Sequence, residues 1–256
     1  MADGPLSWGL STRRPGPAGK SVRAGGASVA LVASALFVLA AGAGHVASAA
    51  TPGPINVLKK DFSQPAAMAV VGDDLFVADL GGQSLTEVDG LTGAVVTVLS
   101  DPKYEFDRPS SILRSGPELF VANNYGNSVT ELDAATGALV RVISGAAYHF
   151  DGPESLALTA GHLFVANEYN DSVTELTAAT GTLVRVIVGA AYHFDRPLAL
   201  VAAGAHIFVA SYGMNATGPN GTVVQVGAAV TELSASSGAL VKVLSGSAMA
   251  STDRSP

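Results

Sequence analysis

The sequence contains no cysteine. This absence excludes a disulfide framework, a thiolate metal site and a cysteine nucleophile, so stability must come from packing and hydrogen bonds. Charged residues make up only 14% and aromatic residues 6% of the 256 residues. Beyond residue 50 no stretch shows the 3.6-residue apolar spacing of an amphipathic helix, which argues against helical repeats.

Clusters of basic residues are missing beyond residue 23. Arg13, Arg14, Lys20 and Arg23 stand against the single Asp3 before residue 50, so the remaining chain carries a formal charge of about −10. Nucleic-acid binding needs a basic stripe, and we expect no nucleic-acid partner. The chain also has no Ser/His/Asp elbow, phosphate loop or His-Glu-x-x-His motif. The sequence therefore predicts no metal site and no cofactor, and it gives no independent reason to expect an enzyme.

What the chain does contain is glycine, proline and aliphatic residues. There are 29 glycines and 13 prolines, and 48% of the residues are apolar. This composition favours many short strands joined by tight turns.

The first 49 residues have the order of a secretory leader. A basic region (1–23) precedes an apolar run (24–43) and the small-residue pattern Ala47-Ser48-Ala49. We expect a signal peptide over residues 1–49 and a secreted or cell-envelope location. The apolar run approaches the length of a membrane span, so an uncleaved anchor is the alternative.

A repeat of 44 residues dominates the rest of the chain. It is marked by Phe62, Phe106, Phe150 and Phe194, each followed three residues later by proline. In the second unit, β-type runs cover 110–114, 118–122, 128–133 and 138–144, separated by turn residues. Four strands in a period of 40 to 50 residues are typical of a propeller blade. The sequence thus predicts an all-β fold, a β-propeller of four detectable four-stranded blades, over residues 50–250, with a short tail at 251–256.

The segment from Phe120 to Gly137, FVANNYGNSVTELDAATG, and its near copy from Phe164 to Gly181 resemble the repeat of the YVTN-type β-propellers, relatives of the NHL repeats. The resemblance covers roughly residues 55–246. It implies a propeller but no single activity, because that family includes binding, sensing and surface proteins and a few enzymes such as the streptogramin lyases.

The blade count leaves ring closure open. Residues 55–58 resemble a fourth strand without a blade, and Ser251 stands where a fifth phenylalanine would fall. We expect a closed or nearly closed ring, small or incomplete for its family. The alternatives are pairing with a second copy through open blade edges and a truncated propeller with no site of its own.

In a propeller blade, the loops from the fourth strand to the next blade and from the second to the third strand emerge on one face. In this chain those loops are the longer, more polar and more variable ones. We expect a glycan, peptide or protein ligand on this face. The candidate ligand-binding residues are Tyr104, Asp107, Asn123, Asn124, Tyr125, Tyr148, His149, Asn167, Glu168, Tyr169, Tyr192, His193 and Tyr212.

Plainer roles compete with some of these predictions. The repeated phenylalanines suit the packing between blades, and the repeated Thr-Glu pair faces Arg141, Arg185 or Lys242 as a cross-strand ion pair. An alternative function is a metal-assisted lyase or hydrolase with His149 or His193 as general base. Finally, a 13-residue insertion in the last unit contains Asn220-Gly221, which predicts an extra hairpin.

The leader makes a direct prediction. Expressed in a host that exports it, the chain should lose residues 1–49 and begin at Ala50, as read by N-terminal sequencing of the secreted or periplasmic product. A full-length chain of 25.6 kDa in the membrane fraction would instead indicate the anchor.

Overall fold

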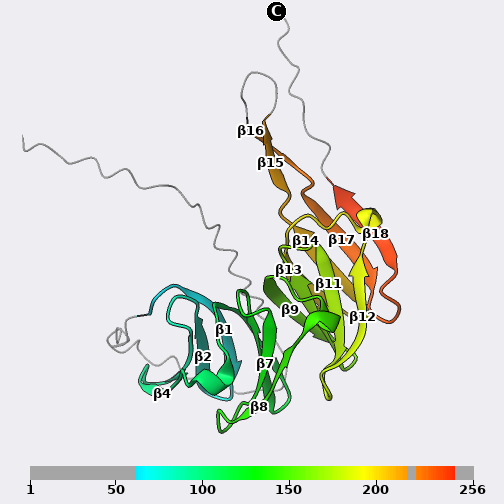
Figure 1. Cartoon of the computed structure of the whole chain (residues 1–256). Coiled ribbons are helices and arrows are strands. Elements are labelled where there is room, and N and C mark those ends of the chain that lie inside the picture. Colours follow the sequence, from blue (N-terminus) through cyan, green and yellow to red (C-terminus); the bar gives the residue numbers. More distant parts are fainter. Residues whose placement is uncertain (1–61, 218–222, 246–256) are drawn as a thin grey trace, which may run out of the picture. The chain divides into compact units, whose positions relative to one another are not determined.

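The computed structural model describes residues 62–217 and 223–245. These residues form four antiparallel sheets of four strands each, in which every strand pairs with its neighbour along the chain apart from the insertion in the last sheet. Figure 1 colours the sheets from cyan in the first to red in the last. The predicted all-β fold with four four-stranded blades is confirmed.

Each sheet is one blade, with strands called a to d in chain order. Blade one comprises β1 (Pro65–Val71), β2 (Asp74–Asp79), β3 (Ser84–Asp89) and β4 (Val95–Leu99). Blade two comprises β5 (Pro109–Ser115), β6 (Glu118–Asn123), β7 (Ser128–Asp133) and β8 (Leu139–Ser144). Blade three comprises β9 (Pro153–Thr159), β10 (His162–Asn167), β11 (Ser172–Thr177) and β12 (Thr182–Val188). Blade four comprises β13 (Pro197–Ala203), β14 (His206–Ser211), β17 (Ala229–Ser234) and β18 (Leu240–Ser245).

In each blade, the backbone N–H of the c–d turn glycine donates to the carbonyl of the residue four positions earlier. In blade two, Asp133 Oδ1 accepts hydrogen bonds from the backbone N–H groups of Ala135 and Thr136 at 3.2 and 2.8 Å. The turn ends at Gly137, whose φ of 67° is a left-handed value that favours glycine. A side chain there would also meet Leu99 of blade one at 3.2 Å. The glycine is therefore required by both the turn and the adjoining blade.

Three apolar layers join consecutive blades. The layer between blades two and three contains Phe120, Ala122, Val129 and Ile143 from blade two, covered by residues of blade three that include Phe150. Corresponding residues form the layers between blades one and two and between blades three and four. Phe106, Phe150 and Phe194 are thus core residues between blades, as expected.

No apolar layer joins blade one to blade four within residues 62–217 and 223–245. The packed blades therefore form a row with two end faces, and the expected closed ring is not seen in the packing of the described residues. The unassigned strand (55–58), Ser251, the leader and the tail all lie outside these residues.

The predicted cross-strand ion pairs form in blades two and three. Glu131 pairs with Arg141, whose Nη2 lies 3.0 Å from Glu131 Oε1. Glu175 Oε2 lies 2.8 Å from Arg185 Nε. His162, at the start of β10, places Nδ1 2.9 Å from the other oxygen of Glu175. Burial raises the pKa of the Glu175 carboxyl, and the neighbouring Arg185 and His162 oppose this effect without outweighing it.

The insertion forms a separate two-stranded sheet, in which β15 (Met214–Thr217) pairs with β16 (Val223–Val226). It lies between strands b and c of blade four, which confirms the predicted hairpin; Asn220-Gly221 falls outside the described residues. None of the helical segments in the described part of the chain could span a membrane.

Blade one lacks the base that pairs with the repeated glutamate, because Glu87 faces Thr97. Burial, followed by the nearby Asp74 carboxylate, raises the pKa of Glu87. Thr97→Arg should supply the missing partner and raise the free energy of unfolding by about 0.5 to 1 kcal/mol in urea denaturation. Val98→Arg places the same charge on the opposite side of β4 and should give no gain; an equal gain from both would contradict the ion-pair explanation.

Candidate functional site

The d–a and b–c loops of each blade are held together by backbone hydrogen bonds. In blade two, the N–H groups of Asn124 and Tyr125 donate to the carbonyls of Arg108 and Asp107 at 3.0 and 3.3 Å. Blades three and four repeat the pattern, with Glu168 donating to Gly152 and Tyr212 to Arg196. The two sets of loops therefore lie side by side, as the sequence predicted for the candidate face.

The tyrosines in the d–a loops are packing residues. Each ends a 3₁₀ turn, namely η1 (Pro102–Tyr104), η2 (Ala146–Tyr148) or η3 (Ala190–Tyr192). Each ring stacks on the phenylalanine two residues later, at 5.3 to 5.4 Å between centroids. The hydroxyl groups donate to the carbonyls of the c–d glycines, at 2.9 Å for Tyr104. The structure thus places Tyr104, Tyr148 and Tyr192 in the scaffold, where their polar ends are already satisfied.

Asn123 and Asn167 also have internal partners. The fully buried Asn123 donates from Nδ2 to Ser128 Oγ at 3.0 Å and to Thr130 Oγ1 at 2.9 Å. Asn167 makes the same two bonds to Ser172 and Thr174. These amides connect strand b to strand c at the end of the hairpin in blades two and three. Their role is therefore structural.

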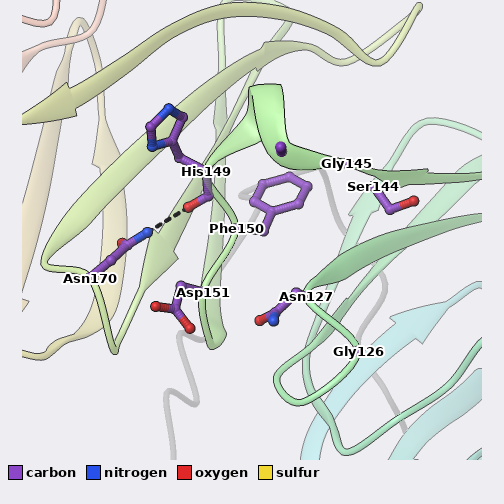
Figure 2. Close-up of a pocket in the computed structure, with 9 residues that line it drawn as sticks. Gly126, Asn127, Ser144, Gly145, His149, Phe150, Asp151 and Asn170 are labelled. Atoms are coloured by element: carbon purple, nitrogen blue, oxygen red, sulfur yellow. Dashed lines mark hydrogen bonds between the residues drawn. The ribbon is translucent and has the colours of Figure 1, made fainter.

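A cleft of about 480 Å³ lies between the loops of blades two and three. Figure 2 shows its lining, which includes Asn127, His149, Phe150, Asp151 and Asn170. Asn170 Nδ2 donates to the carbonyl of His149 at 2.7 Å, and the imidazole of His149 extends away from the carboxylate of Asp151 (Figure 2). The cleft is polar and exposed, and it offers amide and carboxylate groups to a ligand.

His149 and His193 occupy equivalent positions in successive blades. Each directly follows its 3₁₀ turn in the left-handed conformation, with φ of 54° and 51°. Both side chains are exposed. In the described part of the chain, no three His, Cys, Asp or Glu side chains are grouped closely enough to hold a metal ion.

A second group, here called the tyrosine–arginine cluster, gathers on the same face. It consists of Arg108, Asn124, Tyr125, Glu154, Glu168, Tyr169, Arg196 and Tyr212. Five of these were candidates from the sequence, and each of the other three, Arg108, Glu154 and Arg196, contacts at least one of them.

Asn124 of blade two joins two residues of blade three. Its buried amide donates to Glu154 Oε2 at 2.9 Å and accepts from the hydroxyl of Tyr169 at 3.2 Å. The guanidinium of Arg108 lies 4.1 Å from the ring centroid of Tyr125, a cation–π distance. Blades two and three are thus connected across the face by polar side chains.

Arg196 extends the cluster to blade four. It forms an ion pair with the buried Glu168, with Nε 3.1 Å from Oε1, and its guanidinium lies 5.5 Å from the ring of Tyr212. The hydrogen bond that the guanidinium donates to Glu168 raises the pKa of Arg196. Arg196 therefore stays charged and neutralises one of the two carboxyl groups of the cluster.

Glu154 is the other carboxyl group. Burial, followed by the negative charge of Glu168, raises its pKa from 4.5 to about 7. The hydrogen bond from Asn124 and the charges of Arg108 and Arg196 act in the opposite direction but do not outweigh burial. Glu154 can therefore change its protonation state near neutral pH.

The three residues that the sequence did not single out share a signal. Arg108 and Arg196 fill the variable position of Phe-Asp-x-Pro in blades two and four, and Glu154 follows Pro153 where the other blades have alanine, serine or leucine. A charged residue at a position that varies along a regular repeat is what identifies them.

Comparison with known proteins agrees with this architecture. The family model described as outer membrane protein assembly factor BamB matches residues 51–187, more than half of the chain. The chain belongs to this family. No curated protein matches it by sequence.

Several solved structures share the fold of this BamB-family chain. Hydrazine synthase of Kuenenia stuttgartiensis has a TM-score of 0.59 at 18% identity, over 75% of this chain and 52% of that one. U3-55K has a TM-score of 0.57 at 15% identity, over 73% and 53%, and the RRP9 WD40 repeats have 0.54 at 14%, over 73% and 65%. The chain spans about half the length of the first two, and at these identities the likeness concerns the fold alone.

Glu154 makes stability depend on pH. Because its folded pKa lies above the unfolded value, the folded state holds the proton more tightly, and stability falls as the pH rises from about 4.5 to about 7. Between pH 5 and pH 8 the wild type should lose about 2 kcal/mol more of unfolding free energy than Glu154→Gln, as measured by urea denaturation. The exposed Glu105, changed to Gln, is the control and should follow the wild type. Parallel pH profiles for wild type and Glu154→Gln would show that the carboxyl titrates normally.

Proposed function

We propose that this chain is a non-catalytic, exported or envelope-associated β-propeller that binds a peptide or protein on the face formed by its d–a and b–c loops. The observation that carries the proposal is the tyrosine–arginine cluster. Tyr125 and Tyr169 are 54% and 52% exposed, so both rings are accessible to a ligand.

The chemistry of the cluster suits a polypeptide ligand. Tyrosine and arginine are enriched among the residues that dominate protein interfaces, since each offers a large apolar surface with a polar end. Arg108 adds a positive charge beside the exposed ring of Tyr125. A ligand carbonyl or carboxylate would interact with this charge, and the Tyr125 ring would pack beside it.

The family supports an interaction role and an envelope location. Its description names an outer membrane protein assembly factor, and the leader expected over residues 1–49 would export the chain. Within this setting, we retain the YVTN-type resemblance as the finer assignment, because FVANNYGNSVTELDAATG and its copy provide strands b and c and the loop between them.

A peptide display library selected on the immobilised full chain tests the proposed face. Selected peptides should lose at least tenfold in affinity for the Tyr125→Ala/Tyr169→Ala variant, because both exposed rings are removed. Calorimetry or surface plasmon resonance on the synthetic peptides gives the comparison.

The control is Leu91→Ala, an exposed apolar residue in the c–d turn of blade one. It should leave peptide affinity unchanged. Peptides that bind both variants like the wild type would place the site elsewhere. If a glycan array gave tyrosine-dependent binding while no peptide was selected, the polypeptide assignment would be wrong.

A further inference from the structure

The three layers between blades are built from equivalent residues. Between blades three and four, Phe164, Ala166, Val173 and Ile187 form one side. The opposite side comes from the next blade and includes Leu200 of strand a. The repeat thus defines two matching surfaces, an outgoing face on each blade and an incoming face on the blade that follows.

Blade four has an outgoing face that the described residues leave uncovered. Val230 is 36% exposed, whereas its counterpart Val173 is 0% exposed. Leu244 is 50% exposed, whereas its counterpart Ile187 is 4% exposed. The remaining residues of this face, Phe208 and Ala210, are half-buried rather than buried.

Blade one has the opposite end surface. Met68 occupies the position of Ile112, Leu156 and Leu200, which are all at most 9% exposed, yet Met68 is 64% exposed. The strand order and the Phe62-x-x-Pro65 spacing are those of every blade that covers a preceding one. Blade one therefore carries an incoming face with no partner blade in the described residues.

We propose that copies of this chain associate head to tail, with the incoming face of blade one in one copy packed on the outgoing face of blade four in the next. The repeat indicates which surface would cover the outgoing face of blade four. The incoming face of blade one is equivalent in sequence to the surfaces of blades two, three and four that cover the other outgoing faces.

The polar edge of the seam fits the same arrangement. Arg141 and Arg185 each extend beyond their own blade, and their Nη2 atoms donate to the carbonyls of Ala179 and Ser236 in the c–d turn of the next blade. Lys242 takes this position in blade four and is exposed. In the proposed assembly, Lys242 donates the equivalent hydrogen bond to a carbonyl in the c–d turn of blade one in the second copy.

Such an interface is heterologous, so it either closes into a ring or continues as a filament. Two copies of four blades give eight, the upper end of the usual range for propellers. Closure as a dimer would also remove both exposed apolar faces, which otherwise favour association.

The first experiment is light scattering after size exclusion on the full exported chain over a range of concentrations. The wild type should have the mass of two chains. Leu244→Asp places a charge in the proposed seam and should give a monomer at the same concentrations, with unchanged circular dichroism. The matched control is Val241→Asp on the same strand. Val241 is also 50% exposed, but its counterparts Val140 and Val184 are exposed in the inner blades too, so this variant should remain dimeric.

The second experiment determines how the two copies are oriented. Because the sequence contains no cysteine, only the introduced thiols can form a disulfide. Within the chain, Ser155 Oγ accepts from the backbone N–H of Leu200 across the seam at 3.0 Å. The repeat makes Ala199 and Met68 the corresponding pair between copies. A mixture of Ala199→Cys and Met68→Cys chains should form a disulfide-linked dimer on mild oxidation, whereas each variant alone should not.

The remaining outcomes overturn the proposal. A wild type that is monomeric at every concentration would show that copies of this chain do not associate through the two end faces. Cross-linking of Ala199→Cys with itself at the same yield would indicate a face-to-face dimer rather than head-to-tail packing.

Discussion

The structure depends on the packing of one blade's phenylalanine and first strand against the strands of the blade before it. A four-stranded sheet of this size buries too little apolar surface on its own, so each blade is stable only against a neighbour. Phe106, Phe150 and Phe194 supply this contact, and their prolines start the strands that follow. The c–d glycines belong to the same constraint, because a side chain at Gly181 would lie 3.0 Å from Ile143 of the preceding blade.

This constraint distinguishes the residues that hold the blades together from the candidate binding residues. Residues that hold the seam or close a hairpin, such as Tyr104 and Asn123, have counterparts in neighbouring blades, and their donor groups bond to partners inside the protein. The binding site that we propose lies at positions where the repeat varies, and three of these place Arg108, Glu154 and Arg196 beside candidate residues of the same face. The ion pair between Glu168 and Arg196 leaves Glu154 as the carboxyl whose charge depends on pH near neutrality.

The sequence predicted the fold well because the repeat is regular. A 44-residue period with fixed phenylalanine, proline and glycine positions fixes strand number, turn positions and the Glu131–Arg141 pairing. It predicted the candidate site less well, since periodicity cannot tell which way a side chain points. Tyr148 and Tyr125 look equally suitable in the sequence, yet one stacks on Phe150 and the other lies exposed beside Arg108. Ring closure could not be predicted either, because it depends on what covers the two end faces rather than on the repeat.

The central claim, that each blade is stabilised by the blade that covers it, is tested most directly by native-state hydrogen exchange in dilute protein. Strand b of blades two and three, β6 and β10, is sealed by a following blade, whereas β14 of blade four is not sealed within the described residues. The account predicts that the amides of β14 exchange measurably faster than those of β6 and β10. Equal protection of the three strands in monomeric protein would contradict it.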